Sequence, residues 1–135
     1  MGIGIINSII NLNSNHCIEA EIGGRCGFSP REMRCLLASE EKDGLTSKEL
    51  SRRIGLSPSR GSRLINSFIK RGLFFIKADL DDRRCHRILL SVSGREQVLE
   101  IKNRIGECEK RLLSKLSTEE IDSIRKAMAI LSEKL

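Results

Sequence analysis

The pattern of apolar and polar residues predicts a mainly helical protein. Apolar residues recur three and four positions apart over most of the chain, which is the spacing of one face of a helix. Capping boxes, each a Ser or Thr followed three residues later by Glu, mark three helix starts: Ser29, Thr46 and Ser117. The helix after Ser29 is expected to stop at Asp43 and Gly44, and two apolar stripes beyond residue 94 predict two C-terminal helices.

The N-terminal segment predicts a weaker helix. Residues 3–22 carry Ile and Leu at helical spacing, with asparagines between them, and Gly23 and Gly24 are expected to break the helix. The apolar residues follow no basic stretch and are too few to span a bilayer. We therefore expect a cytoplasmic protein with neither a signal peptide nor a membrane partner.

Two short apolar runs, residues 73–77 and 87–92, interrupt the helical pattern. The charged segment between them, residues 78–86, predicts the loop of a β-hairpin. Before this hairpin come a short capped helix, a turn at Gly55 and a second helix that starts at Ser57 and Pro58. The predicted fold is mainly α with a small β-hairpin wing: a winged helix-turn-helix joined to a helical dimerisation region.

The helix that starts at Ser57 gives the strongest indication of the protein's function. Its apolar stripe leaves small polar and basic residues on the other side, near the N-terminal end. Such a helix suits the major groove of DNA, because small residues let the backbone approach and Arg reads guanine through two hydrogen bonds. The candidate DNA-binding residues of this helix are Ser57, Ser59, Arg60, Ser62, Arg63 and Asn66.

The positive charge is concentrated on the same motif. Residues 46–87 carry eleven Lys or Arg and four Asp or Glu, a net charge of +7, whereas the rest of the chain carries thirteen and fourteen. A local excess of this kind is what a surface facing phosphates needs. The chain has 135 residues, the size of one domain, and four Phe with no Trp or Tyr predict an aliphatic core.

The hairpin supplies further candidates for DNA binding. Lys77 ends the first apolar run, and Arg83 and Arg84 lie on the charged tip. An Arg on such a tip suits the narrow, electronegative minor groove of A·T-rich DNA. Asp82 is expected to hold one guanidinium through a charged hydrogen bond.

From about Phe28 to its C-terminal end the chain resembles the MarR family of winged-helix transcription regulators. SPREMRCLLAS corresponds to the helix before the motif, and LTSKELSRRIGLSPSRGSRLINSFIKRGL to the helix-turn-helix. DDRRCHRILLSVSG corresponds to the wing and the start of a long dimerisation helix, and LSTEEIDSIRKAMAILSEKL to the final helix. One departure is Gly61, which stands where the family usually has an apolar residue, so we expect a more loosely packed recognition helix.

The resemblance implies a homodimeric repressor on a pseudo-palindromic operator, with recognition helices in successive major grooves and wings in the flanking minor grooves. It also implies release by a signal: a small molecule bound between the DNA-binding part and the dimerisation helices, or a change at cysteines. We expect residues 29–93 to form the winged helix-turn-helix, residues 94–135 the dimerisation helices, and residues 1–28 a helical segment for dimerisation or sensing.

Cys17 and Cys26 are the candidates for a sensory site. In a cytoplasmic protein, cysteines are expected to be reduced thiols, metal ligands or redox sensors and not structural disulfides. These two flank the glycine pair and are candidates both for redox chemistry and for a metal. An iron–sulfur cluster or a zinc ion, with His16 or Cys108 as a further ligand, stays open beside the alternative of thiols with no sensory role.

Cys85 on the wing is a third redox candidate, beside the alternative of a thiol that is merely exposed on the loop. It lies between Arg84 and His86, whose positive charge would lower the pKa of its thiol. Cys35, in contrast, occupies the place of an apolar core residue and is expected to be inert.

The sequence disfavours two other classes of function. The sequence has no GxSxG, P-loop or HExxH pattern and no nucleophile placed with a base, so we do not expect an enzyme. The alternative is a winged-helix module that binds protein without recognising an operator, which the +7 patch disfavours.

Overall fold

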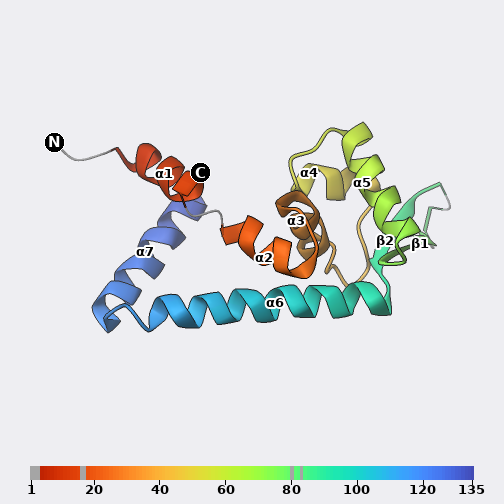
Figure 1. Cartoon of the computed structure of the whole chain (residues 1–135). Coiled ribbons are helices and arrows are strands. Elements are labelled where there is room, and N and C mark those ends of the chain that lie inside the picture. Colours follow the sequence, from red (N-terminus) through yellow and green to blue (C-terminus); the bar gives the residue numbers. More distant parts are fainter. Residues whose placement is uncertain (1–3, 16–17, 80, 83) are drawn as a thin grey trace. The chain divides into compact units, whose positions relative to one another are not determined.

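The computed structural model describes residues 4–15, 18–79, 81–82 and 84–135, which form two compact units, Met1–Ile101 and Lys102–Leu135. The predicted fold class is confirmed: the described residues are mostly helical, with one antiparallel hairpin (Figure 1). The helices are α1 (Ile5–Asn15), α2 (Ile18–Cys26), α3 (Pro30–Ala38), α4 (Ser47–Arg53), α5 (Pro58–Lys70), α6 (Val92–Leu113) and α7 (Thr118–Lys134). The strands are β1 (Phe74–Ala78) and β2 (His86–Leu90).

The predicted helix starts are confirmed. Ser29, Thr46 and Ser117 each accept a hydrogen bond from the backbone N–H of a Glu three residues later, whose side chain accepts one in return. Ser57 caps α5 by accepting from the backbone N–H of Arg60 at 3.4 Å. These bonds satisfy N–H groups that lack a partner inside the helix, and they explain why α3, α4, α5 and α7 begin where they do.

The prediction that Gly23 and Gly24 break the first helix is wrong. Both lie inside α2, and Gly23 is buried there. The backbone N–H of Phe28 donates to the Gly23 carbonyl at 2.6 Å, and a Cβ on Gly23 would lie only 2.6 Å from the Phe28 carbonyl oxygen. Gly23 therefore allows the chain to fold back closely over the end of α2, a reason that local propensity does not reveal.

The predicted end of the next helix is also wrong. The helix α3 ends at Ala38, before Asp43 and Gly44. The hydroxyl of Ser39 donates to the Leu36 carbonyl at 2.6 Å, so a side chain satisfies a carbonyl of the last turn. The freed chain reaches Leu45, which pairs with Ile88 in a short antiparallel bridge on β2.

The core of the first unit is built around α5. Within this unit α4 packs on α5 and on α3, α2 packs on α3, and α5 packs on β1 (Figure 1). The Phe68 ring lies 6.1 Å from the Phe28 ring and 5.1 Å from the Phe74 ring, measured between centroids. The expected aliphatic core is thus wrong at its centre, because three of the four Phe meet there.

Gly61 is the point of closest approach between α4 and α5. It is buried, and a Cβ at this position would lie 1.7 Å from the Ser51 Oγ and 2.5 Å from the Ser51 Cβ. The expectation of a loosely packed recognition helix is therefore wrong. The missing side chain lets the two helices of the helix-turn-helix lie closer than any larger residue would allow.

The hairpin is confirmed, with strand ends one or two residues away from those expected. Phe74 pairs with Leu90 and Ala78 with His86 at its two ends. One face packs on the core, and Phe75 and Ile76 stay 45% and 50% exposed.

The second unit holds the end of α6 and the whole of α7. No residue of α7 is buried, although it carries an apolar stripe.

Large apolar side chains are exposed along three helices of the two units. They are Ile5, Ile6, Ile10 and Leu12 in α1, Leu99, Ile105 and Leu112 in α6, and Ile124, Met128 and Ile130 in α7. Among the described helices, none combines the length and the apolar character that a membrane span requires.

Candidate nucleic-acid interface

The outer face of α5 carries the predicted recognition residues. Ile65 and Phe68 are buried on the opposite face, which fixes the rotation of the helix. Ser62 is half-buried, and the other candidates are exposed: Ser57, Ser59, Arg60, Arg63 and Asn66. Ser57 already uses its hydroxyl as the cap of the helix, so its role is first to hold the N-terminal turn.

Two further residues of this face were not among the predicted DNA-binding residues. A shallow hollow of about 430 Å³ is lined by Arg63, Asn66, Ser67, Lys70 and Arg71. Ser67 and Lys70 are exposed there, four and seven positions after Arg63 on the same side of the helix. Helical spacing from Arg63 was the signal that pointed to them.

Three arginines of the basic patch are engaged within the protein. Arg53 Nη1 lies 2.6 Å from Glu41 Oε1, and Arg87 Nε lies 3.1 Å from Asp79 Oδ2. Arg71 Nη1 donates to Glu32 Oε2 at 2.6 Å. Positive charge counted along the sequence therefore overstates what faces a partner.

The remaining cations gather on α4, α5 and the hairpin. All of them are exposed, and none forms an ion pair within the described part of the chain. They are Lys48, Arg52, Arg60, Arg63, Lys70, Lys77 and Arg84. Arg83, also predicted to bind DNA, lies outside the described residues.

Arg71 holds the C-terminal end of α5 against the core. Its guanidinium lies 5.1 Å from the centroid of the Phe28 ring and 5.3 Å from that of Phe68. Partial burial alone would raise the pKa of its partner Glu32, but hydrogen bonds from the Ser29 backbone N–H and from Arg71 outweigh burial and lower this pKa. Arg71 is thus a structural residue at the edge of the recognition face.

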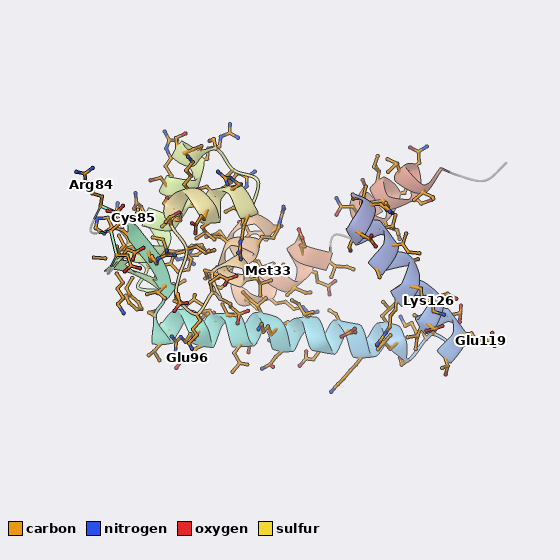
Figure 2. All side chains as sticks on the ribbon, turned by 180° about the vertical axis from the view of Figure 1, so that it is seen from behind. Met33, Arg84, Cys85, Glu96, Glu119 and Lys126 are labelled. Atoms are coloured by element: carbon orange, nitrogen blue, oxygen red, sulfur yellow. The ribbon has the colours of Figure 1, made fainter. Side chains whose placement is uncertain are left out.

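The Asp82 carboxylate on the wing tip has a different hydrogen-bond partner from the one expected. Asp82 Oδ1 accepts from the backbone N–H of Arg84 at 3.0 Å and does not clasp the Arg84 guanidinium. Arg84 projects from the tip of the hairpin with Cys85 next to it on the same loop (Figure 2). The expectation that Asp82 holds a guanidinium is wrong for Arg84, whose side chain stays exposed for a partner.

The pKa of the Cys85 thiol also differs from the prediction. Its Sγ lies 3.6 Å from the Asp82 Oδ2 to which it donates. The Asp82 carboxylate raises the pKa of the thiol, so the expected lowering by Arg84 and His86 is wrong. Cys35 is fully buried, and burial raises its pKa to about 12, which fits the expected inert role.

The other candidate cysteines are only partly described. Cys26 is half-buried at the end of α2, while Cys17 and His16 lie outside the described residues. Cys108 is half-buried on α6, where Arg111 Nη2 donates to its Sγ at 3.2 Å. Among the described residues, no three His, Cys, Asp or Glu side chains gather as metal ligands would.

Comparison with known proteins identifies the motif. The model of the MarR family matches residues 27–84, from the loop before α3 to the tip of the wing. This segment of the chain is similar to the winged helix-turn-helix of the MarR family. The predicted family resemblance is thereby confirmed, and the proteins that share it are regulators, in agreement with the expectation that the chain is not an enzyme.

The curated relatives that this chain matches are regulators by name. The transcriptional repressor MprA of Escherichia coli is 32% identical over 88 residues, which are 65% of this chain and 50% of MprA. The chain thus spans about half the length of the curated relatives it matches.

Solved structures share the fold. The MarR family transcription regulator SP03579 has a TM-score of 0.80 at 16% identity, covering 95% of this chain and 88% of that one. The Staphylococcus aureus MepR–DNA complex has a TM-score of 0.77 at 20% identity, covering 99% of this chain and 100% of MepR. At such identities the likeness shows the fold alone.

Proposed function

We propose that this protein is a sequence-specific regulator of transcription that binds double-stranded DNA through α5 and the wing. The main observation behind the proposal is that the basic side chains fall into two groups, those paired with acidic residues of the protein and those exposed to solvent. Arg53, Arg71 and Arg87 form ion pairs with Asp or Glu of the protein, whereas seven exposed Lys and Arg on the helix-turn-helix and the hairpin form no ion pair with the described residues. The relatives support it by name, since MprA is a transcriptional repressor and MepR was solved on DNA.

The residues divide the work of binding. Ser59, Arg60, Ser62, Arg63 and Asn66 enter the major groove, where base edges are distinguishable. Lys77, Arg83 and Arg84 meet the flanking backbone and minor groove. Residues 29–93 form the DNA-binding part, and residues 1–28 and 94–135 provide dimerisation and sensing.

The protein acts as a homodimer in this proposal, and the operator is a pseudo-palindrome. The exposed apolar stripes of α1, α6 and α7 support a second copy as the partner, because helices of this kind bury such a stripe. Analytical ultracentrifugation should give twice the mass of the chain. Met128→Glu should dissociate the dimer and Ser123→Glu, which adds the same charge off the stripe, should not; a monomeric wild type contradicts the dimer.

Regulation is proposed to be repression relieved by a signal. The signal is either a small molecule or oxidation or metal binding at Cys17 and Cys26. Metal content and DNA binding before and after mild oxidation separate the two: loss of binding on oxidation favours the cysteines. Unchanged binding in a metal-free protein directs the search to a small molecule.

Salt dependence of DNA binding tests the proposal. Each phosphate neutralised by Lys or Arg contributes about 0.9 to the slope of log affinity against log salt, so the seven exposed cations allow a magnitude of up to about 6 per chain. Fluorescence anisotropy with the DNA upstream of its own gene measures this slope. A slope near zero, or no binding at low salt, contradicts the proposal.

The alternative is a winged-helix module that binds protein. The exposure of Phe75 and Ile76 on the hairpin favours it, because large apolar side chains at the surface are common in protein interfaces. Retention on heparin with steep release by salt supports DNA binding, and passage through heparin supports the alternative.

A further inference from the structure

Arg87 joins three parts of the structure at the root of the wing. Its position on β2 is opposite Lys77 of β1. Arg87 Nε donates to Asp79 Oδ2 at 3.1 Å, and Arg87 Nη1 donates to the Gly44 carbonyl at 3.3 Å. One guanidinium therefore ties β2 to the start of the wing loop and to the segment before α4.

Asp79 continues this network into the tip. Its Oδ1 accepts from the Asp81 backbone N–H at 3.0 Å, and its own backbone N–H donates to the Cys85 carbonyl at 2.9 Å. The hydrogen bond from the Asp81 backbone N–H and the Arg87 guanidinium lower the pKa of Asp79, so its side chain is a carboxylate at neutral pH. The residue after β1 thus connects the root of the wing to the loop that carries Arg84.

Resting on the function proposed above, we propose that Arg87 and Asp79 are positioning residues that direct the wing tip toward DNA. Arg87 is turned inward by two acceptors and is a poor phosphate contact itself. Arg84 is exposed and forms no ion pair with the described residues. A two-stranded hairpin is marginally stable alone, so the direction of its tip depends on ties at its root.

The direction in which one substitution changes DNA affinity distinguishes a positioning role from a simple effect of charge. Asp79→Asn removes a negative charge beside the basic patch, and electrostatics alone would tighten DNA binding. Positioning predicts the opposite, a loss of about tenfold in affinity. Asn keeps the oxygen that accepts from Asp81, so the loop turn is preserved. Asp122→Asn in α7, where the carboxylate pairs with Lys126, is the matched control and should leave affinity unchanged.

A conservative change at Arg87 gives a second, independent readout. Arg87→Lys keeps the charge, but an ammonium lacks the planar fork that reaches both Asp79 and Gly44. We expect it to weaken binding about as much as Asp79→Asn. A phosphate contact, in contrast, would be served almost as well by Lys.

The deciding experiment is a double-mutant cycle in fluorescence anisotropy, with the same duplex and salt throughout. Wild type, Asp79→Asn, Arg84→Ala and the double variant are titrated. If Asp79 acts through Arg84, Asp79→Asn costs about tenfold in the wild-type background and little in the Arg84→Ala background. A general loss of structure would instead weaken both backgrounds equally.

Each outcome decides one claim. Tighter or unchanged binding by Asp79→Asn, or the same loss in both backgrounds, overturns the positioning role and leaves the DNA-binding function intact. Wild type that binds no duplex overturns the proposed function as well.

Discussion

Replacing Gly61 by Ala should force α4 and α5 apart. The added Cβ would lie 2.5 Å from the Ser51 Cβ, whereas carbon atoms in contact prefer about 3.5–4.0 Å. Rotation of the Ser51 side chain moves its Oγ but leaves its Cβ in place, so the helices must separate. Overpacking of this kind costs about 1–3 kcal/mol, and the better helix propensity of Ala returns up to about 1 kcal/mol. We expect unfolding free energy to fall by about 1–2 kcal/mol.

Exchanging the two side chains tests this reasoning. Ser51→Gly removes both atoms that the new Cβ would meet, leaving the Ser51 Cα at 3.2 Å. Ser51→Gly alone is also destabilising, because it loses helix propensity and the 2.7 Å hydrogen bond to the Ser47 carbonyl. The double variant carries one side chain at the crossing, as the wild type does. Its loss should be smaller than the sum of the two single losses by about 1–2 kcal/mol.

Urea unfolding followed by circular dichroism, at one protein concentration, measures these differences. Gly24→Ala is the control, because a Cβ there meets nothing within 4 Å and should stabilise α2. A Gly61→Ala variant that is as stable as the wild type would refute the close approach of the helices. So would a double variant whose loss of unfolding free energy equals the sum of the two single losses.

Other substitutions give further expectations. Gly23→Ala should lower unfolding free energy by about 1–3 kcal/mol in the same assay, because the new Cβ would lie 2.6 Å from the Phe28 carbonyl oxygen; a neutral effect contradicts this. Arg63→Ala should cost about 1–3 kcal/mol of operator binding and relax base preference, seen by anisotropy with single-base variants. Glu32 binds protons more weakly folded than unfolded, so its stabilisation is present above about pH 4.3 and is lost as pH falls through its lowered pKa. The stability gap between wild type and Glu32→Gln should therefore shrink in acid, and a constant gap would argue against the charge.

Features encoded within a few residues were predictable from the sequence. The capping boxes at Ser29, Thr46 and Ser117 lie within single turns, and the hairpin follows from two apolar runs and a charged loop. The apolar stripe of α5 likewise indicated which side faces out.

Features that depend on distant partners were missed. From the sequence alone, Gly23 was expected to break a helix and Gly61 to loosen one. In the structure Gly23 lies close to Phe28 and Gly61 lies close to Ser51. Charge counting could not tell that Arg71 would meet Glu32, 39 residues earlier in the chain. Which cations remain for DNA is decided by such pairings and not by composition.

Selection of bound duplexes from a random DNA library tests the central claim most directly. A homodimer with two recognition helices should enrich an inverted repeat whose half-sites lie about 10 base pairs apart, centre to centre. Arg63→Ala should lose the preference at one position of each half-site. Recovery of unrelated sequences, with binding that depends only on salt, would contradict sequence-specific regulation through α5.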